Sequence, residues 1–277
     1  MKRACVIGWP IGHSRSPVIH NYWLAAYGIE GEYTAVPVPP EELKNFLQNL
    51  PAAGYVGCNV TIPHKQAAFG YLTVRDPVSR AIGAINTVYI RDGETYGVNT
   101  DAPGFISSLV AGAQSAGWQQ TPAAVLGAGG AARAIVFALR DAGVPEIRIS
   151  NRTRSRAEEL ARAVGPTAVV ADWSSRNDVL AGCGLLVNAT ALGMDGKPPL
   201  DIDLAHLPTN AIVTDIVYTP LTTPLLDAAL RRGNPVVDGL GMLLHQAVPG
   251  FELWFGVKPE VTPALRAHVA ADLEAAE

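Results

Sequence analysis

The sequence predicts an α/β fold in two domains, one of which is a doubly wound parallel sheet. Three observations lead to this prediction. The length of 277 residues suits two domains of ordinary size, each with its own core. Short apolar strand segments alternate with helical segments along most of the chain, as in sheets covered by helices. Near the middle, residues 123–150 follow the order strand, glycine turn, helix and strand within about thirty residues.

Composition limits the kinds of partner. Hydrophobic residues make up 48% and charged residues 17%, which is typical of a compact enzyme. The net charge of −4 provides no field for nucleic acid, and no run of about eighteen apolar residues could span a membrane. Cys5, Cys58 and Cys183 are odd in number and far apart, so they indicate buried thiols in a reducing compartment. We therefore expect a cytoplasmic protein with no nucleic-acid partner, no membrane partner and no metal site.

The N-terminal segment carries two serines that suit a bound anion. Residues 4–7 are predicted to form a strand, followed by a helix with Pro17 in its first turn and Ser16 as its N-cap. In the extended segment before this helix, Ser14 and Ser16 can face one way and Arg15 the other. Two hydroxyls at a helix N-terminus can hold a substrate carboxylate. Simple capping by Ser16 explains the same pattern equally well.

A lysine follows the third predicted strand. Strands are predicted at 33–37 and 57–62, with a helix at 40–50 between them. Pro63 is expected to begin another helix, which places Lys65 in its first turn. The helix dipole disfavours a cation there, so this position favours a role in proton transfer over that of a solvated surface lysine.

An aspartate follows a predicted hairpin. Segments 85–90 and 95–100 flank the pair Asp92-Gly93, which is typical of a tight hairpin turn. Asp101 comes directly after the second arm, and a helix through about residue 113 begins after it. The position of Asp101 at this strand end suits a catalytic carboxylate. The alternative is a carboxylate that only stabilises the following helix by interacting with its dipole.

The glycine turn in the middle of the chain predicts a dinucleotide site. Gly127 permits the tight turn after the strand, and Gly129 lets the backbone approach a pyrophosphate. Ala132 is small enough for close packing of the following helix, predicted over 133–142, against the strand. The amides at the start of this helix would point at the phosphates, and Gly143 would end it.

The residues after the predicted strand at 147–150 indicate which cofactor binds. An NAD site usually has an acidic residue here, which bonds to the ribose 2′-hydroxyl. This chain instead has Asn-Arg-Thr-Arg-Ser-Arg at 151–156. Guanidinium groups grip a phosphate that a carboxylate would repel, so the segment favours NADP, with Arg152 and Arg156 as stronger candidates than Arg154.

Further elements complete the doubly wound domain. The remaining predicted strands are 168–171, 185–188, 211–217 and 235–238, and the remaining predicted helices are 178–181, 224–232 and 242–254. Gly233 should end the second of these helices, and Pro249 should kink or interrupt the third. Gln246 lies near that break, where a glutamine in an apolar helix indicates a ligand contact or a buried hydrogen bond.

These elements divide into two predicted domains with a cleft between them. Residues 102–240 are expected to form the Rossmann-type nucleotide-binding domain. Residues 1–101, together with about 241–277, are expected to form an α/β substrate domain, because glycines at 239 and 241 suggest that the chain crosses back.

Seven motifs follow one another along the chain, at residues 8–17, 59–65, 83–87, 97–101, 127–133, 151–156 and 238–243. Together they resemble the shikimate dehydrogenase family, over essentially the whole chain. The resemblance implies reversible, NADPH-dependent reduction of 3-dehydroshikimate to shikimate, a step of chorismate and aromatic amino-acid biosynthesis. Two positions depart from the family pattern: Ala102 stands where glycine is usual, and Ala191 where serine is usual.

The resemblance also implies roles for individual residues. Lys65 and Asp101 match the catalytic pair of the family. The implied substrate contacts are Ser14, Ser16, Thr61, Asn86, Tyr218 and Gln246. The implied cofactor contacts are Gly127, Gly129, Gly130, Ala131, Asn151, Arg152, Thr153 and Arg156, with Ile216 and Gly239 near the nicotinamide. The expected partners are thus a small-molecule substrate and NADP, for a chain that is a monomer or a homodimer.

The chemistry agrees with these roles and leaves some alternatives open. A ketone that accepts a hydride becomes an alkoxide, which Lys65 can protonate while Asp101 holds the lysine in line; either could be the formal proton donor. A quinate/shikimate or aminoshikimate dehydrogenase is the nearest alternative, since few hydrogen bonds read the ring substituents. A non-catalytic NADP-binding sensor would be expected to lack Lys65 or Asp101. A nucleoside triphosphatase loop is excluded, because no Gly-Lys-Ser/Thr follows the glycines.

Overall fold

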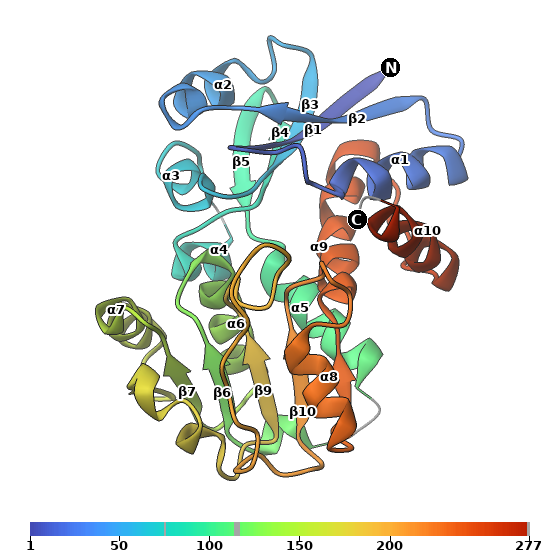
Figure 1. Cartoon of the computed structure of the whole chain (residues 1–277). Helices are drawn as coiled ribbons and strands as arrows, with labels where there is room; N and C mark the ends of the chain where they lie inside the picture. Colours follow the sequence, from blue (N-terminus) through green and yellow to red (C-terminus); the bar gives the residue numbers. More distant parts are fainter. Residues whose placement is uncertain (75, 114–116, 276–277) are drawn as a thin grey trace. The chain divides into compact units, whose positions relative to one another are not determined.

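The computed structural model describes residues 1–74, 76–113 and 117–275, and the chain forms two compact units (Figure 1). Unit 1 comprises Met1–Asp101 and Leu243–Glu277, and unit 2 comprises Ala102–Met242. Each unit has its own sheet, so the α/β fold class predicted from the sequence is confirmed. Of the helices described, none is both long and apolar enough to cross a membrane.

Unit 1 contains a mixed sheet of five strands in the order β2-β1-β3-β4-β5. The strands are β1 (Lys2–Gly8), β2 (Gly31–Pro37), β3 (Tyr55–Val60), β4 (Thr87–Arg91) and β5 (Glu94–Val98). β1 runs parallel to β2 and β3, whereas β4 is antiparallel to β3 and β5. The predicted hairpin turn is confirmed: Asp92 and Gly93 have φ values of 53° and 77°, the left-handed conformation that a two-residue turn requires.

The helices of unit 1 agree with the predicted order but differ at their ends. They are α1 (Ser16–Ala26), the 3₁₀ turn η1 (Pro40–Glu42), α2 (Leu43–Asn49), α3 (Lys65–Phe69), α4 (Pro77–Ile82) and α10 (Pro263–Glu274). The helix predicted to begin at Pro63 begins at Lys65. Helices α4 and α10 were not predicted from the sequence, although at α4 Asp76 precedes Pro77 and caps the helix by accepting from Val78 N and Ser79 N.

The prediction that Ser16 caps α1 is wrong. The N-cap is Arg15, which makes no side-chain cap hydrogen bond, and Ser16 is already the first helical residue. The Ser14 hydroxyl oxygen takes the role instead, because it accepts a hydrogen bond from Ser16 N at 3.3 Å. Pro17 lies in the first turn as predicted.

The core of unit 1 joins segments that are far apart in the sequence. Cys5 on β1 lies beside Cys58 on β3, and both thiols are free and fully buried, as predicted. Trp254, from the C-terminal part of the chain, packs on β3 where a side chain at Gly57 would overlap the indole. The indole Nε1 donates to Val88 O at 2.8 Å, so the C-terminal segment closes this core.

Unit 2 contains a parallel sheet of six strands, shown by the arrows of Figure 1. The strands are β6 (Ala123–Leu126), β7 (Ile147–Ser150), β8 (Ala168–Ala171), β9 (Leu185–Asn188), β10 (Ile212–Asp215) and β11 (Val236–Val237), in the order β11-β10-β9-β6-β7-β8. Counted from β6, this is the strand order 3-2-1-4-5-6 of the Rossmann fold, as predicted. Ligands of such sheets bind where the order reverses, which here is between β6 and β9.

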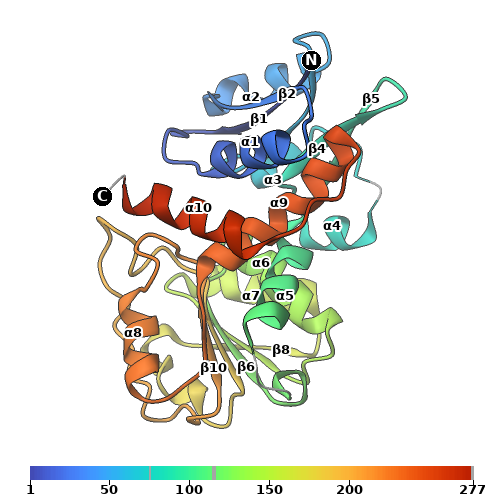
Figure 2. The same ribbon diagram turned by 90° about the vertical axis from the view of Figure 1, so that its right-hand side faces the viewer.

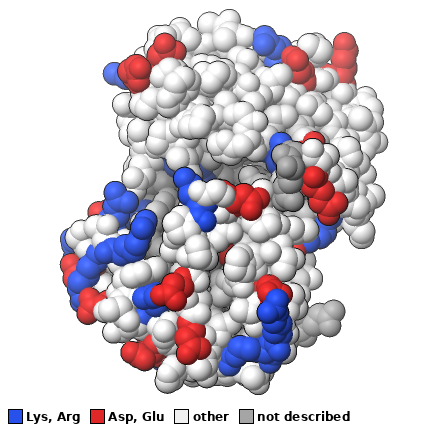
Figure 3. Space-filling view, viewed as in Figure 1, with Lys and Arg blue, Asp and Glu red and all other residues white. Residues whose placement is uncertain are grey.

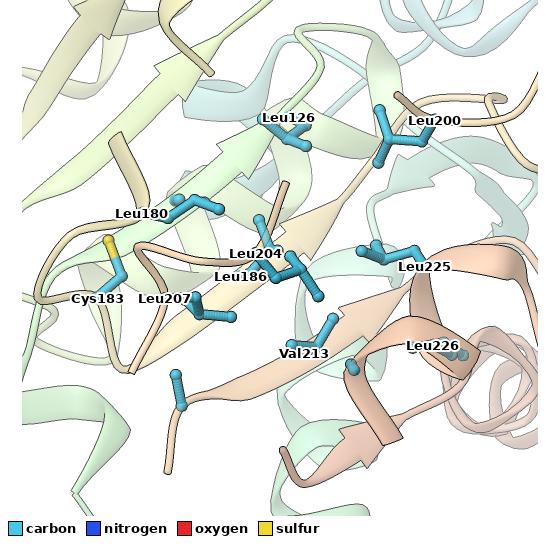
Figure 4. Close-up of a cluster of buried hydrophobic side chains, with 13 residues drawn as sticks. Leu126, Leu180, Cys183, Leu186, Leu200, Leu204, Leu207, Val213, Leu225 and Leu226 are labelled. Atoms are coloured by element: carbon cyan, nitrogen blue, oxygen red, sulfur yellow. The ribbon is translucent and has the colours of Figure 1, made fainter. Parts of the chain in front are cut away.

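Helices cover both faces of the sheet in unit 2. They are α5 (Asp101–Gly112), α6 (Gly130–Asp141), α7 (Arg154–Val164), α8 (Pro224–Arg231) and the first part of α9 (Gly239–Phe255). Figure 2 shows α8 on one face and α5 and α6 on the other. The segment predicted as a helix at 178–181 is only a 3₁₀ turn, η4 (Asp178–Leu180). The core beneath α8 consists mainly of leucines from the strands and the connecting segments (Figure 4).

Two helix boundaries correct the predictions in this region. α6 begins at Gly130, three residues earlier than predicted, so the glycine turn itself forms the start of the helix; it ends before Gly143, whose φ is 86°. Pro249 was predicted to kink or interrupt α9, and the interruption is wrong, because the helix continues through it. Ala247, Phe251 and Trp254 are buried on either side of the proline, and this packing compensates for the missing backbone hydrogen bond.

Candidate active site

Lys65 and Asp101 form an ion pair in unit 1. Lys65 is the first residue of α3, after the end of β3, and Asp101 is the first residue of α5, after the end of β5. The lysine Nζ donates to Asp101 Oδ2 at 2.5 Å. The lysine side chain is 17% exposed and the aspartate side chain 6%, so the lysine is the more exposed partner of the pair. A buried carboxylate thus holds a partly exposed lysine side chain in place.

Two further predicted residues lie against this pair. Asn86 Nδ2 donates to Asp101 Oδ1 at 2.8 Å, and Gln246 Oε1 lies 3.3 Å from the same nitrogen. Both side chains are buried, although they belong to segments far apart in the sequence. Each oxygen of Asp101 therefore accepts a hydrogen bond, one from Lys65 and one from Asn86.

The backbone of Asp101 is held by residues that the sequence analysis did not single out. Asp101 N donates to Asn99 Oδ1 at 3.0 Å. Asn99 N in turn donates to the Ser79 hydroxyl oxygen at 2.7 Å, and that hydroxyl donates to Asp76. The aspartate that caps α4 thus also supports the segment that carries Asp101, and the only sequence signal for this was the Asp-Pro pair at 76–77.

The serines and the threonine predicted to bind substrate follow the ends of β1 and β3. These two strands are parallel neighbours, so their carboxyl ends meet at one edge of the sheet. Thr61 N donates to Ile7 O at 2.9 Å, which places Thr61 beside β1. Arg15 forms an ion pair with Asp272 at 3.0 Å instead of joining the serines. Within the described residues, no hydrogen bond joins Ser14, Ser16 or Thr61 to the Lys65–Asp101 pair.

The glycine turn of unit 2 fits a bound pyrophosphate. Gly127 has a φ of 116°, and a Cβ on it would lie 2.8 Å from Ala189 O, so only glycine is accommodated. Gly129 has nothing within 4 Å of the position where its Cβ would be, so its backbone faces open space. No side chain caps the N-terminus of α6, which begins at Gly130 and continues through Ala131 and the fully buried Ala132. The amides of this first turn are therefore available to an anion.

The three arginines after β7 differ in their partners. Arg154 donates to Glu158 Oε1 at 2.8 Å and to Asp172 Oδ1 at 2.5 Å, and these carboxylates, Asp172 first, raise its pKa. Arg152 and Arg156 are exposed and have no ion pair within the described part of the chain. Figure 3 shows basic side chains gathered over α7, whose basic residues are all arginines. The geometry therefore leaves Arg152 and Arg156, not Arg154, for a phosphate.

The other predicted residues of unit 2 lie near the ends of β7, β10 and β11. Asn151 Nδ2 donates to Thr153 O at 2.8 Å, and Thr153 precedes α7 without capping it. Ile216 packs against Gly239, where a Cβ would approach Ile216 O to 2.5 Å. Tyr218 is half-buried two residues further along.

Three family models match successive parts of the chain. The shikimate dehydrogenase substrate binding domain matches residues 6–88, the shikimate / quinate 5-dehydrogenase model matches 110–193, and the shikimate 5′-dehydrogenase C-terminal domain matches 239–267. The shikimate dehydrogenase (NADP(+)) of Paramagnetospirillum magneticum is 55% identical over 96% of this chain and 97% of its own. The chain belongs to the shikimate dehydrogenase family.

Solved structures of shikimate dehydrogenases and their relatives have the same fold. The shikimate 5-dehydrogenase of Thermus thermophilus, in complex with NADP(H) and shikimate, has a TM-score of 0.87 at 39% identity and covers 99% of this chain and 100% of its own. The quinate dehydrogenase of Corynebacterium glutamicum, in complex with NAD, has a TM-score of 0.90 at 32% identity and covers 98% and 99%.

This member of the shikimate dehydrogenase family also contains a buried polar cluster that the sequence analysis missed. Asn188 ends β9 and Asp215 ends β10, and Asn188 Nδ2 donates to Asp215 Oδ1 at 3.0 Å. Asp215 also accepts from Val217 N at 3.0 Å and from the Thr223 hydroxyl at 2.8 Å. Burial raises the pKa of Asp215, against the smaller effects of these hydrogen bonds. The available signal was a lone polar residue at the end of each of two apolar strands.

Proposed function

We propose that this chain reduces 3-dehydroshikimate to shikimate with NADPH, reversibly, as a step of aromatic amino-acid biosynthesis. The observation that carries the proposal is the Lys65–Asp101 pair, with Nζ 2.5 Å from Oδ2, in a chain that shares more than half its residues with an NADP-dependent shikimate dehydrogenase. NADPH, when bound, supplies the hydride. The residues of the chain must then bind the two molecules and move one proton.

Lys65 and Asp101 are the residues that would move this proton. The Lys65 ammonium is the only member of the pair with a proton to give while Asp101 accepts at both oxygens. It would donate to the oxygen that becomes the hydroxyl of shikimate and would accept the proton in the reverse direction. Asp101 would hold the ammonium in line, because its own position is set by Asn86 and by the Asn99 side chain.

Substrate and cofactor binding are assigned to different units. Residues 1–101 with about 241–277 would form the substrate domain, with Ser14, Ser16 and Thr61 as hydroxyl contacts and Asn86 and Gln246 as amide contacts. Residues 102–240 would form the NADP-binding domain, which would also contribute Tyr218 to the substrate. The parallel neighbours β1 and β3, whose carboxyl ends lead into the segments that carry these hydroxyl residues, support the first assignment.

The fit described above supports a set of proposed NADP contacts. Gly127, Gly129, Gly130 and Ala131 would hold the pyrophosphate at the start of α6. Arg152 and Arg156 would bind the 2′-phosphate, helped by Asn151 and Thr153. Ile216 and Gly239 would lie at the nicotinamide. The open space at Gly129 and the unpaired state of Arg152 and Arg156 within the described residues support this assignment.

The test compares initial rates with shikimate and with quinate, each with NADP+ and with NAD+. Shikimate with NADP+ should give the highest kcat/KM of the four pairs. The likeness to a quinate dehydrogenase in complex with NAD favours a second candidate, a quinate/shikimate dehydrogenase. A higher kcat/KM for quinate, or for NAD+, would establish that candidate. Aminoshikimate in the same assay tests a third candidate, an aminoshikimate dehydrogenase.

Compartment and assembly belong to the proposal as well. Three buried free thiols fit a reducing compartment, which supports action in the cytoplasm. A monomer or a homodimer is expected, and light scattering of the purified chain distinguishes the two. Binding of NADPH without turnover of any of these substrates would instead identify a sensor.

A further inference from the structure

A chain of hydrogen bonds runs through unit 1 to the Asp101 carboxylate. It begins at the Tyr33 hydroxyl, which donates to Asn59 Oδ1 at 2.6 Å. Asn59 Nδ2 donates to the Thr87 hydroxyl oxygen at 3.0 Å, and that hydroxyl donates to Asn86 Oδ1 at 3.2 Å. Asn86 Nδ2 completes the chain at Asp101 Oδ1. We call Tyr33, Asn59, Thr87 and Asn86 the buried relay.

Two backbone groups fix the direction of the buried relay. Asn86 Oδ1 accepts from Thr100 N at 2.7 Å, and a backbone N–H can only donate. Asn59 Nδ2 donates to the Asn86 backbone oxygen at 3.1 Å, and a carbonyl can only accept. Neither amide can turn over without losing its backbone partner. The NH2 group of Asn86 therefore faces Asp101, and every link donates toward the carboxylate.

The surroundings keep the buried relay in this state. Its four side chains are no more than 5% exposed, so each hydrogen bond acts in a medium of low polarity and polarises the next. Burial raises the pKa of Tyr33, and the neighbouring Cys5 and Cys58 raise it further, so its hydroxyl keeps the proton that it donates. The His20 ring stacks on Tyr33 at 4.1 Å, and burial lowers the pKa of His20 to about 3, so no cation forms there.

We propose that Tyr33, Asn59 and Thr87 are positioning residues for the reaction. They hold Asn86 with its NH2 group on one oxygen of Asp101, which leaves the other oxygen to orient the Lys65 ammonium. This inference rests on the proposed function. None of the three touches Lys65 or Asp101 directly, so they act through Asn86.

Thr87 provides the sharpest test, because valine has nearly the same shape without the hydroxyl. Thr87→Val should lower kcat about tenfold, the factor that corresponds to about 1.4 kcal/mol, while KM for shikimate changes by less than about twofold. Thr87→Ser keeps the hydroxyl and should restore kcat to within about twofold of the original. Thr262→Val is the matched control, since it removes the hydroxyl that caps α10 in the same unit. It should lower the melting temperature and leave kcat unchanged.

Tyr33→Phe extends the test to the far end of the buried relay. Its effect on kcat should be smaller than that of Thr87→Val, because two more links separate it from Asp101. An unchanged kcat in Thr87→Val and in Tyr33→Phe would overturn the proposal. An equal loss of kcat in Thr87→Val and Thr87→Ser would overturn it as well, and would leave a purely structural role.

A measurement without substrate separates this inference from the proposed function. In NMR spectra of the free chain, the side-chain NH2 of Asn86 should exchange slowly with solvent, and Thr87→Val should move its resonances and speed that exchange. A chain inactive on shikimate that still shows this change would refute the proposed function alone. An Asn86 signal insensitive to Thr87→Val would refute the buried relay, whatever the activity.

Discussion

The Nζ atom of Lys65 lies 2.5 Å from Oδ2 of Asp101, and the two residues begin two different helices, α3 and α5. The pair is asymmetric, because the lysine is the more exposed partner and the aspartate is held on its other oxygen by Asn86. A truncation of the lysine should therefore remove the mobile proton without disturbing the carboxylate's remaining contacts.

Lys65→Ala should lower kcat by about two to four orders of magnitude, the range typical of a lost general acid. Shikimate binding should be largely kept, because the other proposed substrate contacts remain. Steady-state kinetics and calorimetric titration measure the two quantities. Lys44→Ala, an exposed lysine on α2, is the control and should be active. Near-normal turnover of the Lys65 variant would remove this residue from the reaction.

Arg152→Ala should weaken NADPH binding about 10- to 100-fold and leave NADH binding nearly unchanged, because only NADPH carries the 2′-phosphate. Arg154→Ala is the matched control: its guanidinium is already paired with Glu158 and Asp172, so its loss should affect NADPH much less. The KM values of the two variants for NADPH and for NADH test whether Arg152 binds the 2′-phosphate. An equal loss of affinity for NADPH and NADH would show that Arg152 does not read the phosphate.

Two alanine substitutions in the glycine turn should affect different properties, stability in one case and NADPH binding in the other. Gly127→Ala should lower the free energy of unfolding by about 1–3 kcal/mol, because φ is positive and the new Cβ would meet Ala189 O. Gly129→Ala should leave stability nearly unchanged, since its φ is −83° and its surroundings are open, but should weaken NADPH binding. Thermal melting and NADPH fluorescence titration separate the effects. Equal melting temperatures for the two variants would contradict this account.

His20 should make the stability of the chain depend on acid pH. Burial lowers its pKa from 6.5 to about 3, outweighing a smaller opposing effect of Asn59, so below pH 6.5 the unfolded chain takes up a proton that the folded chain refuses. Stability should thus fall as the pH drops from 6.5 toward about 3, by up to about 5 kcal/mol.

His20→Phe keeps the stacked ring against Tyr33 and removes the titration. Denaturant unfolding from about pH 7 to about pH 4 should show a smaller loss of stability in this variant than in the original chain. Parallel pH dependences for the two proteins would mean that His20 is not the group responsible.

The fold class could be predicted because its signals are local. Apolar strands such as 123–126 and 147–150 were correct to the residue, and Gly127 and Gly143 have the positive φ values expected of their positions. Errors arose where tertiary contacts decide. Buried side chains around Pro249 hold a helix through a residue that would break an isolated one.

The candidate site was only partly predictable. Lys65 and Asp101 stood out through their places at strand ends, yet nothing in the local pattern revealed that the two side chains meet, since they lie 36 positions apart in the sequence. Asn59 and Thr87 lie in the motifs at 59–65 and 83–87, but their role was not predicted, because a polar residue inside a strand has many possible partners. Only the paired strands β3 and β4, which place Asn59 opposite Thr87, bring them together.

The indole of Trp254 seated over Gly57 has a consequence for biogenesis. Residues of unit 2 are contiguous from 102 to 242, so that whole unit leaves the ribosome before Trp254 does. The sheet of unit 1 is not covered at Gly57 until the Trp254 side chain has emerged. Unit 1, although most of it is synthesised first, therefore completes its core last.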